Sequence, residues 1–260
     1  MAAANAGHTL RVKVTASDND GLTAATSNAT GAVAAGTGQP AASLGTAIAG
    51  TPNGSGANRS ARIMLRTPTS IQRAYARRSI TIGGRLTQAA GQPIANATLE
   101  VLQQAGDSSR AQAIGQARTD SNGKFTVAVR GGASRSIQIA YRAFSGDGSW
   151  AATATVREGV AAGVVLNVAP RRASSRGTIT LSGRVYGAPR RGVIVALLVF
   201  YRGHWEPFRT PRTNSTGRFS VAYQFQGASG RFPFRAEVLA GQAGYPYEQG
   251  YSRPVSVLTR

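Results

Sequence analysis

The sequence predicts an all-β protein built mainly from two tandem β-sandwiches. Short runs in which every second residue is apolar recur at the spacing typical of antiparallel sandwiches, with turn residues between them. Two motifs occur twice: Gly84-Arg85-Leu86 matches Gly183-Arg184-Val185, and residues 119–127 match residues 213–221. No stretch of helix length shows 3.6-residue periodicity. We therefore expect two seven-stranded antiparallel sandwiches.

The first 35 residues predict only a β-hairpin. Residues 9–15 alternate between apolar and polar side chains, residues 17–21 carry turn chemistry, and residues 22–30 form a weaker second strand. This segment resembles the last hairpin of an incomplete immunoglobulin-like or fibronectin-like domain. An isolated hairpin is marginally stable in water. We therefore expect it to be poorly anchored unless it pairs with a neighbour.

Residues 36–62 are expected to form a flexible linker. They are rich in Gly, Ala, Ser and Thr and contain few bulky apolar side chains. Such a segment buries too little surface to offset the entropy lost on ordering.

Two repeats follow, and we place them at residues 63–158 and 159–260. Apolar residues at period two indicate the strands, as with Ile80, Ile82 and Leu86 in the first repeat. The strands expected in the second repeat are Val164–Val168, Thr178–Tyr186, Val193–Tyr201, Trp205–Arg212, Arg218–Phe225, Phe232–Leu239 and Ser252–Leu258.

A turn between the fourth and fifth strands carries the sharpest local signal. An Asp or Asn side chain can cap its own backbone in an Asx-turn, and a Gly three residues later supplies a positive φ. The Phe that follows is expected to fill the core. The structural turn residues are thus Asp120, Gly123 and Phe125 in the first repeat and Asn214, Gly217 and Phe219 in the second.

These motifs resemble the carboxypeptidase-regulatory-like, transthyretin-like repeats of bacterial extracellular multidomain proteins. The first repeat matches through Gly84-Arg85-Leu86, residues 91–101 and residues 119–125. The second departs from the pattern, because residues 188–192 replace the Gly-x-Pro-Ile element and Asn214 replaces Asp. The resemblance implies an immunoglobulin-like fold and a role as a spacer, stabilising appendage or adhesion module outside the cell.

Composition excludes several classes of function. The chain has 260 residues and no Cys, so disulfides, thiolate nucleophiles and iron–sulfur clusters are excluded. The longest apolar run, residues 193–200, is too short to cross a bilayer. The opening residues lack a secretory signal. We expect an extracellular or cell-envelope location whose signal peptide is not present in this chain.

Catalytic and metal-binding chemistry are not predicted. His8 falls in the hairpin, and His204 falls in an expected turn without a nucleophile motif. Residues 18–21 and 146–148 offer oxygen ligands but lack the full set of a calcium loop. The sequence therefore predicts no enzyme, no cofactor and no metal site.

The net charge of +20 is the strongest feature that could indicate binding, and of the Lys and Arg residues all except Lys13 and Lys124 are arginines. Several arginines fall on predicted strands and could form one guanidinium surface for an anionic polymer. The alternative is a solvated face that reflects GC-rich coding. Nucleic acid is a weaker interpretation, because the arginines are dispersed. The arginines on strands are Arg85, Arg118, Arg130, Arg142, Arg184, Arg218 and Arg235.

Aromatic residues near the C-terminus offer a second binding feature. The tyrosines of loop 245–251 could stack on sugar faces, or they could pack over the end of the sandwich. The candidate ligand-binding residues are Trp205, Tyr245, Tyr247, Tyr251, Arg184, Arg218 and Arg235.

Two functions follow from these features. The first is a non-enzymatic spacer in an extracellular or cell-envelope protein. The alternative is an adhesion module that binds carbohydrate or an anionic polymer, such as a cell-wall or extracellular polysaccharide, through the arginine-rich sheet face and the aromatic loop 245–251. We expect a monomer that does not insert into membranes.

Overall fold

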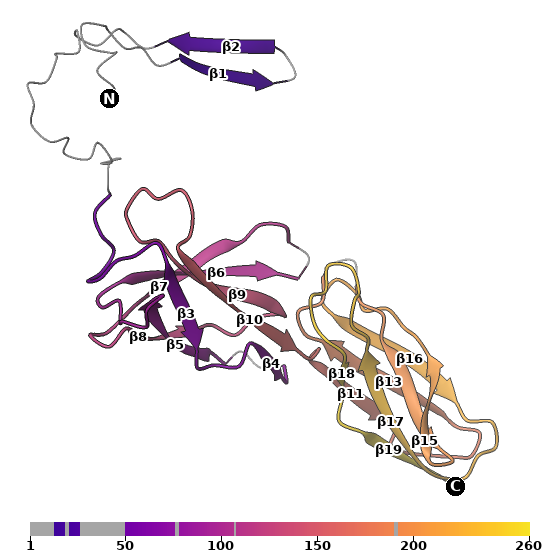
Figure 1. The fold of residues 1–260 in the computed structure, drawn as a ribbon. Coiled ribbons are helices and arrows are strands. Elements are labelled where there is room, and N and C mark those ends of the chain that lie inside the picture. Colours follow the sequence, from indigo (N-terminus) through magenta and orange to yellow (C-terminus); the bar gives the residue numbers. More distant parts are fainter. Residues whose placement is uncertain (1–12, 19–20, 27–49, 76–77, 107, 190–191) are drawn as a thin grey trace, which may run out of the picture. The chain divides into compact units, whose positions relative to one another are not determined.

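The computed structural model describes residues 13–18, 21–26, 50–75, 78–106, 108–189 and 192–260, and within these ranges every regular element is a strand (Figure 1). The chain divides into two compact units, Met1–Ala49 and Gly50–Arg260. In the first unit, β1 (Lys13–Asp18) pairs antiparallel with β2 (Gly21–Thr26). The remainder of the predicted hairpin segment, His8 and linker residues 36–49 lie outside the described residues. The assignment of the hairpin to an incomplete domain stays a prediction.

The first sandwich comprises β3 (Ala61–Leu65), β4 (Ser70–Arg73), β5 (Ile80–Gln88), β6 (Thr98–Ala105), β7 (Gln112–Arg118), β8 (Lys124–Val129), β9 (Arg135–Tyr141) and β10 (Ala152–Val160). One sheet has the order β3-β5-β8 and the other has the order β4-β10-β9-β6-β7. The short strand β4 runs parallel to β10, whereas the other neighbours are antiparallel.

The second sandwich comprises β11 (Val164–Ala169), β12 (Arg172–Ala173), β13 (Thr178–Val185), β14 (Ala196–Tyr201), β15 (His204–Arg209), β16 (Arg218–Gln224), β17 (Gly230–Val238), β18 (Gly250–Tyr251) and β19 (Val255–Thr259). Its sheets have the orders β11-β13-β16 and β12-β19-β17-β14-β15, with β18 beside β17. Apart from β18, this order repeats that of the first sandwich strand for strand, including a parallel pair, β12 with β19.

Each sandwich has its own core, made from the alternate residues that the period-two pattern selects. Ile82, Leu99 and Ile139 are fully buried in the first core. Leu181, Val195 and Ala236 are fully buried in the second. Strand β11 shows the alternation most clearly, because buried and exposed residues follow one another along its whole length. Burial of one face of each strand is what holds the two sheets together.

The strand count differs from the seven predicted for each sandwich, because the described residues form eight named strands in the first and nine in the second. Strands β4, β12 and β18 have four residues or fewer, too few to show a period-two pattern. The predicted strand at 205–212 ends at Arg209 as β15. Pro211 accepts a hydrogen bond from the Val195 amide but has no N–H to return, so the ladder stops there.

Residues 50–60, which the sequence suggests as part of a linker, pair with the first sandwich. The Asn53 N–H donates to the Ala143 carbonyl at 2.8 Å, and the Ser145 N–H donates to the Thr51 carbonyl at 3.0 Å. The Asn53 side chain also bonds the Thr98 N–H, the Thr98 carbonyl and the Arg142 carbonyl. The segment is thus held by hydrogen bonds to backbone groups, which a search for apolar residues does not detect.

Candidate functional site

The turn between β7 and β8 is organised by one carboxylate. Asp120 Oδ1 accepts hydrogen bonds from the N–H groups of Asn122 and Lys124, both at 2.8 Å. Gly123 has φ = 72°, and its carbonyl accepts the Leu86 N–H at 2.8 Å. A Cβ at this position would lie 2.4 Å from the Leu86 oxygen, so both the conformation and the close approach require glycine.

The second sandwich builds the same turn with an amide. Asn214 Oδ1 accepts hydrogen bonds from the N–H groups of Thr216 at 3.0 Å and Arg218 at 2.9 Å. Gly217 has φ = 77° and accepts the Val185 N–H at 2.8 Å. The replacement of Asp by Asn therefore leaves the backbone hydrogen bonds unchanged.

The phenylalanine after each turn explains the repeated Gly-Arg-Leu/Val motif. Phe125 is paired in register with Gly84, and Phe219 is paired with Gly183. A Cβ on Gly84 would lie 2.6 Å from the Phe125 ring, and a Cβ on Gly183 would lie 2.4 Å from the Phe219 ring. The glycine leaves room for the ring to enter the core.

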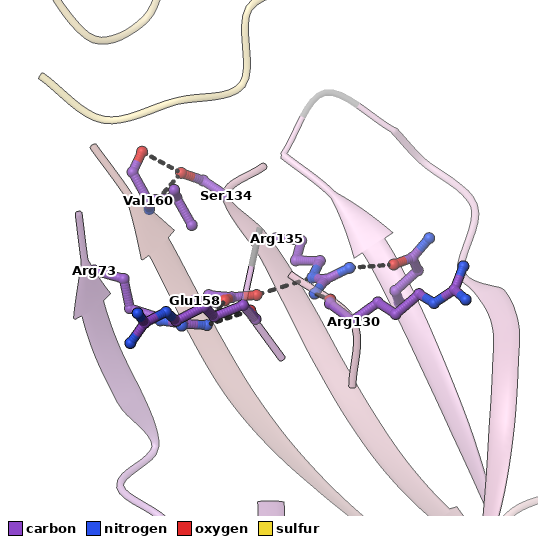
Figure 2. Close-up of polar contacts among 8 residues, drawn as sticks. Arg73, Arg130, Ser134, Arg135, Glu158 and Val160 are labelled. Atoms are coloured by element: carbon purple, nitrogen blue, oxygen red, sulfur yellow. Dashed lines mark hydrogen bonds and ion pairs between the residues drawn. The ribbon is translucent and has the colours of Figure 1, made fainter. Parts of the chain in front are cut away.

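A buried ion-pair cluster lies at one end of the five-stranded sheet, and Figure 2 shows Glu158 between two arginines. The Glu158 side chain is 1% exposed, and its carboxylate oxygens lie 3.1 Å from Arg73 Nη1 and 3.0 Å from Arg135 Nε. Arg135 also donates to Gln103 Oε1 at 2.7 Å and to the Arg130 carbonyl. The sequence offered no signal for this cluster, because its members come from strands far apart in the chain.

The connection between the two sandwiches is only three residues long, Ala161–Gly163, between β10 and β11. The Glu248 N–H donates to the Val160 carbonyl at 2.8 Å, and the Ala162 N–H donates to the Glu248 carbonyl at 2.9 Å. The Ser134 N–H, from the first sandwich, donates to the Pro246 carbonyl of the second at 2.8 Å. Backbone hydrogen bonds between the two sandwiches thus restrain the connection.

Aromatic rings also meet at this junction. Tyr75, which follows β4, stacks on Tyr186 of the second sandwich with ring centroids 5.4 Å apart and planes inclined by 20°. Tyr75 also lies 5.8 Å from Tyr247. A Cβ on Gly163 would lie 2.4 Å from the Tyr75 ring, so glycine admits the ring at the connection. The junction is therefore packed as well as hydrogen-bonded.

The structure places two of the candidate tyrosines at the junction between the sandwiches. Tyr245 is 2% exposed and donates its hydroxyl to the Tyr186 carbonyl at 3.0 Å, and this burial raises the pKa of Tyr245. Tyr247 packs against Tyr75 and Tyr245. Tyr245 is thus too buried to stack on a sugar, Tyr247 is partly exposed, and Tyr251 is 47% exposed. Loop residues 245–248 therefore belong to the junction, because the loop lies over the end of the sandwich where the connection enters.

The remaining aromatic candidates surround Arg235. Its guanidinium carbon lies 4.4 Å from the Trp205 ring centroid and 4.3 Å from that of Tyr251. Among the described residues, Arg235 Nε is buried without a hydrogen-bond partner. Trp205 also contacts the partly exposed Phe200. The arrangement is a cation–π stack on the outer side of the larger sheet.

The predicted arginine residues do not form one surface. Arg85, Arg184 and Arg218 lie on the three-stranded sheets, whereas Arg118 and Arg235 lie on the larger ones. This division arises because the chain crosses several times between the two sheets of each sandwich. Two of these guanidinium groups also have partners within the sandwich. Arg142 lies 3.8 Å from the Trp150 ring centroid and 3.6 Å from Glu100, and Arg85 donates to the Asn122 carbonyl.

Arg184 and Arg218 do come together. They are register partners across β13 and β16, and they line a groove of about 770 Å³ with Arg212. Arg212, which the sequence analysis did not select, reaches this groove because it lies directly before the Asn214 turn. The sequence feature that could have identified Arg212 is its position as a basic residue beside a turn that both repeats share.

Neither histidine chemistry nor a metal cluster emerges from the described residues. His204 Nε2 lies 2.7 Å from Glu206 Oε1, and both side chains are exposed on β15. His204 is therefore not in the turn that the sequence suggests but is the first residue of the strand that follows it, paired with Tyr201. Asp147, in the 146–148 segment, pairs with Arg59 at 2.9 Å, and the Arg59 hydrogen bond lowers the pKa of Asp147. No group of three or more His, Asp or Glu side chains in the described ranges could hold a metal ion.

No family model matches the sequence, and no curated protein matches it. The solved structures that resemble it include the Escherichia coli adhesin FdeC, with 14% identity and a TM-score of 0.32, covering 78% of this chain and 65% of that one. A tetra-tandem repeat from the extending region of a large adhesion protein has 12% identity and a TM-score of 0.36, covering 96% and 56% of the two chains. The D0–D1 domain of intimin has 15% identity and a TM-score of 0.28, covering 76% and 97%.

The matched region is thus less than two thirds of the length of the FdeC and tandem-repeat chains. Within the described residues, no helix has the length and apolar character needed to span a membrane.

Proposed function

We propose that residues 50–260 are a non-enzymatic spacer of an extracellular or cell-envelope protein, in which two sandwich repeats are held as one body. The observation that carries this proposal is the junction. A connection of three residues leaves few backbone torsions free, and three hydrogen bonds and two tyrosine contacts restrain it further. A spacer needs this property, because bending at each joint would shorten its reach.

The repeats are proposed to be immunoglobulin-like. In each, the chain crosses between sheets from β5 to β6, from β7 to β8 and from β8 to β9, or at the equivalent strands of the second sandwich. Crossings of this kind are typical of immunoglobulin-like sandwiches. The proposed repeats are 63–158 and 159–260, with residues 50–62 joined to the first; the end of β10, residues 159–160, also pairs within the first sandwich. The closer resemblance to carboxypeptidase-regulatory-like repeats stays part of this proposal.

Both sandwiches hold the incoming chain in a similar way, which supports a modular role. In the first, the loop between β9 and β10 bonds residues 51 and 53 through Ser145 and Ala143. In the second, the loop between β17 and β19 bonds Val160 and Ala162 through Glu248. We call this arrangement the incoming-chain clasp. Each repeat thus carries the loop that holds the segment entering it from the N-terminal side.

The Glu158 cluster supports the same role from the first sandwich. Glu158 lies two residues before the end of β10, and it joins Arg73 of β4 to Arg135 of β9. Val160, the last residue of β10, donates its N–H to Ser134 Oγ at 2.9 Å (Figure 2). The strand that leads into the junction is therefore anchored on both sides.

The proposal is tested by measuring the distance between the repeats. Because the chain has no Cys, nitroxide labels can be attached at Ser121→Cys and Ser215→Cys, two exposed positions in the equivalent turns. Double electron–electron resonance should give one narrow distance distribution. Tyr75→Ala should broaden it, since the ring that packs on Tyr186 and Tyr247 is removed.

Tyr201→Ala is the matched control, because Tyr201 is 44% exposed in β14 and, among the described residues, its ring does not contact the junction tyrosines. It should leave the distribution unchanged. A flexible Gly-Ser insertion between Ala162 and Gly163 should give the broad distribution of independent repeats. A distribution equally broad in the unmodified chain would rule out the rigid spacer.

A further inference from the structure

Two rows of side chains cross the outer face of the sheet β11-β13-β16. The register places Val165, Arg184 and Arg218 in one row. The neighbouring row is Asn167, Ser182 and Ser220. Every member of both rows lines the 770 Å³ groove. A strip of basic groups thus runs beside a strip of amide and hydroxyl groups.

The basic row is electrostatically unfavourable by itself. Arg184 and Arg218 are direct cross-strand partners, and like charges in this relation destabilise a sheet. Arg212 adds a third guanidinium to the same groove. Within the described ranges, none of these three side chains forms an ion pair or donates a hydrogen bond. An oxyanion in the groove would relieve the repulsion.

A cross-strand pair of like charges also occurs in the first sandwich, where Arg85 pairs in register with Lys124. There, however, Arg85 Nε donates to the Asn122 carbonyl at 2.8 Å. In the second sandwich, the Arg184 guanidinium carbon lies 5.5 Å from the Tyr186 ring centroid and contacts no other ring among the described residues. The second repeat therefore keeps all three guanidinium groups available to a ligand.

The remaining lining groups favour a sugar over a nucleic-acid base. Asn167, Ser182 and Ser220 can bond hydroxyl groups on both sides, as donors and acceptors. Tyr186 is already stacked on Tyr75, and Phe219 is 5% exposed in the core. Single-stranded nucleic-acid sites depend on several aromatic rings on which successive bases stack. This groove offers one exposed ring, Tyr186, which is 36% exposed and already stacked on Tyr75.

We propose that this groove binds the sulfate or carboxylate groups of an acidic linear polysaccharide. The guanidinium groups of Arg184, Arg212 and Arg218 bond the oxyanions, and the Asn167–Ser182–Ser220 row bonds the sugar hydroxyls. This goes beyond the spacer function and does not depend on it, because the groove lies within the second sandwich. The second repeat would then attach the chain to a surface that carries this polysaccharide.

The test compares probes of defined chemistry on the full chain. Isothermal titration with heparin supplies sulfate groups, polygalacturonate supplies carboxylates, and dextran is a neutral control. A single-stranded DNA oligonucleotide of matched charge density tests the nucleic-acid alternative. Titrations in about 150 mM NaCl, where the Debye length is about 8 Å, suppress long-range attraction by the net charge. We expect binding of one or both acidic polysaccharides, weaker binding of DNA and none of dextran.

Two variants with the same net charge distinguish binding at the groove from attraction by the overall positive charge. Arg184→Gln/Arg212→Gln/Arg218→Gln removes three charges from the groove, and affinity for the acidic polysaccharide should fall about tenfold or more. Arg171→Gln/Arg231→Gln/Arg253→Gln removes three exposed charges elsewhere in the second sandwich and should change the affinity by less than about twofold. Equal losses in both variants, tighter binding of DNA, or no binding of either polysaccharide would each overturn the proposal. Circular dichroism of both variants checks that the fold is retained.

Discussion

The Asx-turns show how a single side chain fixes a local structure, and the two repeats provide a natural comparison. Asp120 and Asn214 accept equivalent pairs of backbone hydrogen bonds. Asp120→Asn should therefore leave stability nearly unchanged, whereas Asp120→Ala should lower it by roughly 1 kcal/mol, since both bonds are lost. Urea unfolding of the two variants checks this. Equal destabilisation by both would mean that the carboxylate charge, rather than the hydrogen bonds, supports the turn.

Tyr141 links the first core to the segment before β3. Its hydroxyl donates to the Asn53 carbonyl at 2.8 Å, and its ring is fully buried. Tyr141→Phe should destabilise the fold by about 1–2 kcal/mol, because a partly buried carbonyl loses its partner. Thermal unfolding measures the change. Tyr201→Phe, at an exposed position, should have little effect and serves as the control.

The same tyrosine predicts a pH dependence. Burial raises the pKa of Tyr141 to about 12 from the ordinary tyrosine value of 10.0. Between these values the unfolded chain has lost the proton and the folded chain retains it, so stability falls as pH rises from 10.0 towards about 12. Unfolding measured across this window should show a smaller slope in Tyr141→Phe. An identical slope would show that Tyr141 ionises normally in the folded protein.

At the scale of the elements, the Glu158 cluster joins three strands through one carboxylate. Glu158→Gln leaves Arg73 and Arg135 without a counter-charge, and we expect a loss of about 3 kcal/mol. Glu100→Gln is the matched control in the same sandwich. Its contact with Arg142 is longer, 3.6 Å, and both groups are about one third exposed, so the change should stay below about 1 kcal/mol.

Chemical denaturation of both variants distinguishes these cases. If the two glutamates contributed equally, the burial of Glu158 would have no energetic consequence. In that case the cluster would not anchor the strand that leads to the junction.

The elements also show what the sequence could and could not predict. The alternating strands were predictable, because burial on one face selects an apolar residue at every second position, as in β11 and β16. The two-residue strands β12 and β18 were not, since they depend on a neighbour for pairing rather than on their own composition. The ordering of residues 50–60 depends on the Asn53 amide and distant carbonyls, which no local pattern reveals.

The candidate site was predictable only in part. Arg184 and Arg218 were identified from their strands, because alternation places both on the outer face. Tyr245 and Tyr247 were misleading, since a tyrosine-rich loop looks the same whether it faces solvent or a neighbouring repeat. Glu158, Tyr75 and Arg212 acquire their roles only when distant segments meet.

For the whole molecule, charge imbalance is the dominant electrostatic property. A net charge of +20 produces self-repulsion that favours the expanded chain. The melting temperature should therefore rise as NaCl increases from about 10 mM to about 150 mM, where the Debye length shortens from about 30 Å to about 8 Å. Calorimetry at both concentrations measures this, with sucrose at equal osmolarity as the control. A falling melting temperature would mean that screening of ion pairs outweighs the relief of repulsion.

The incoming-chain clasp has an evolutionary consequence. The loop that forms hydrogen bonds with the preceding segment is encoded within the repeat itself. Duplication of one stretch of gene therefore copies both the fold and the hydrogen bonds that join it to the preceding repeat. An array could then grow by unequal recombination without inventing a new interface each time. Selection would act on the number of copies, and length would become an inherited trait adjustable in steps of a single repeat.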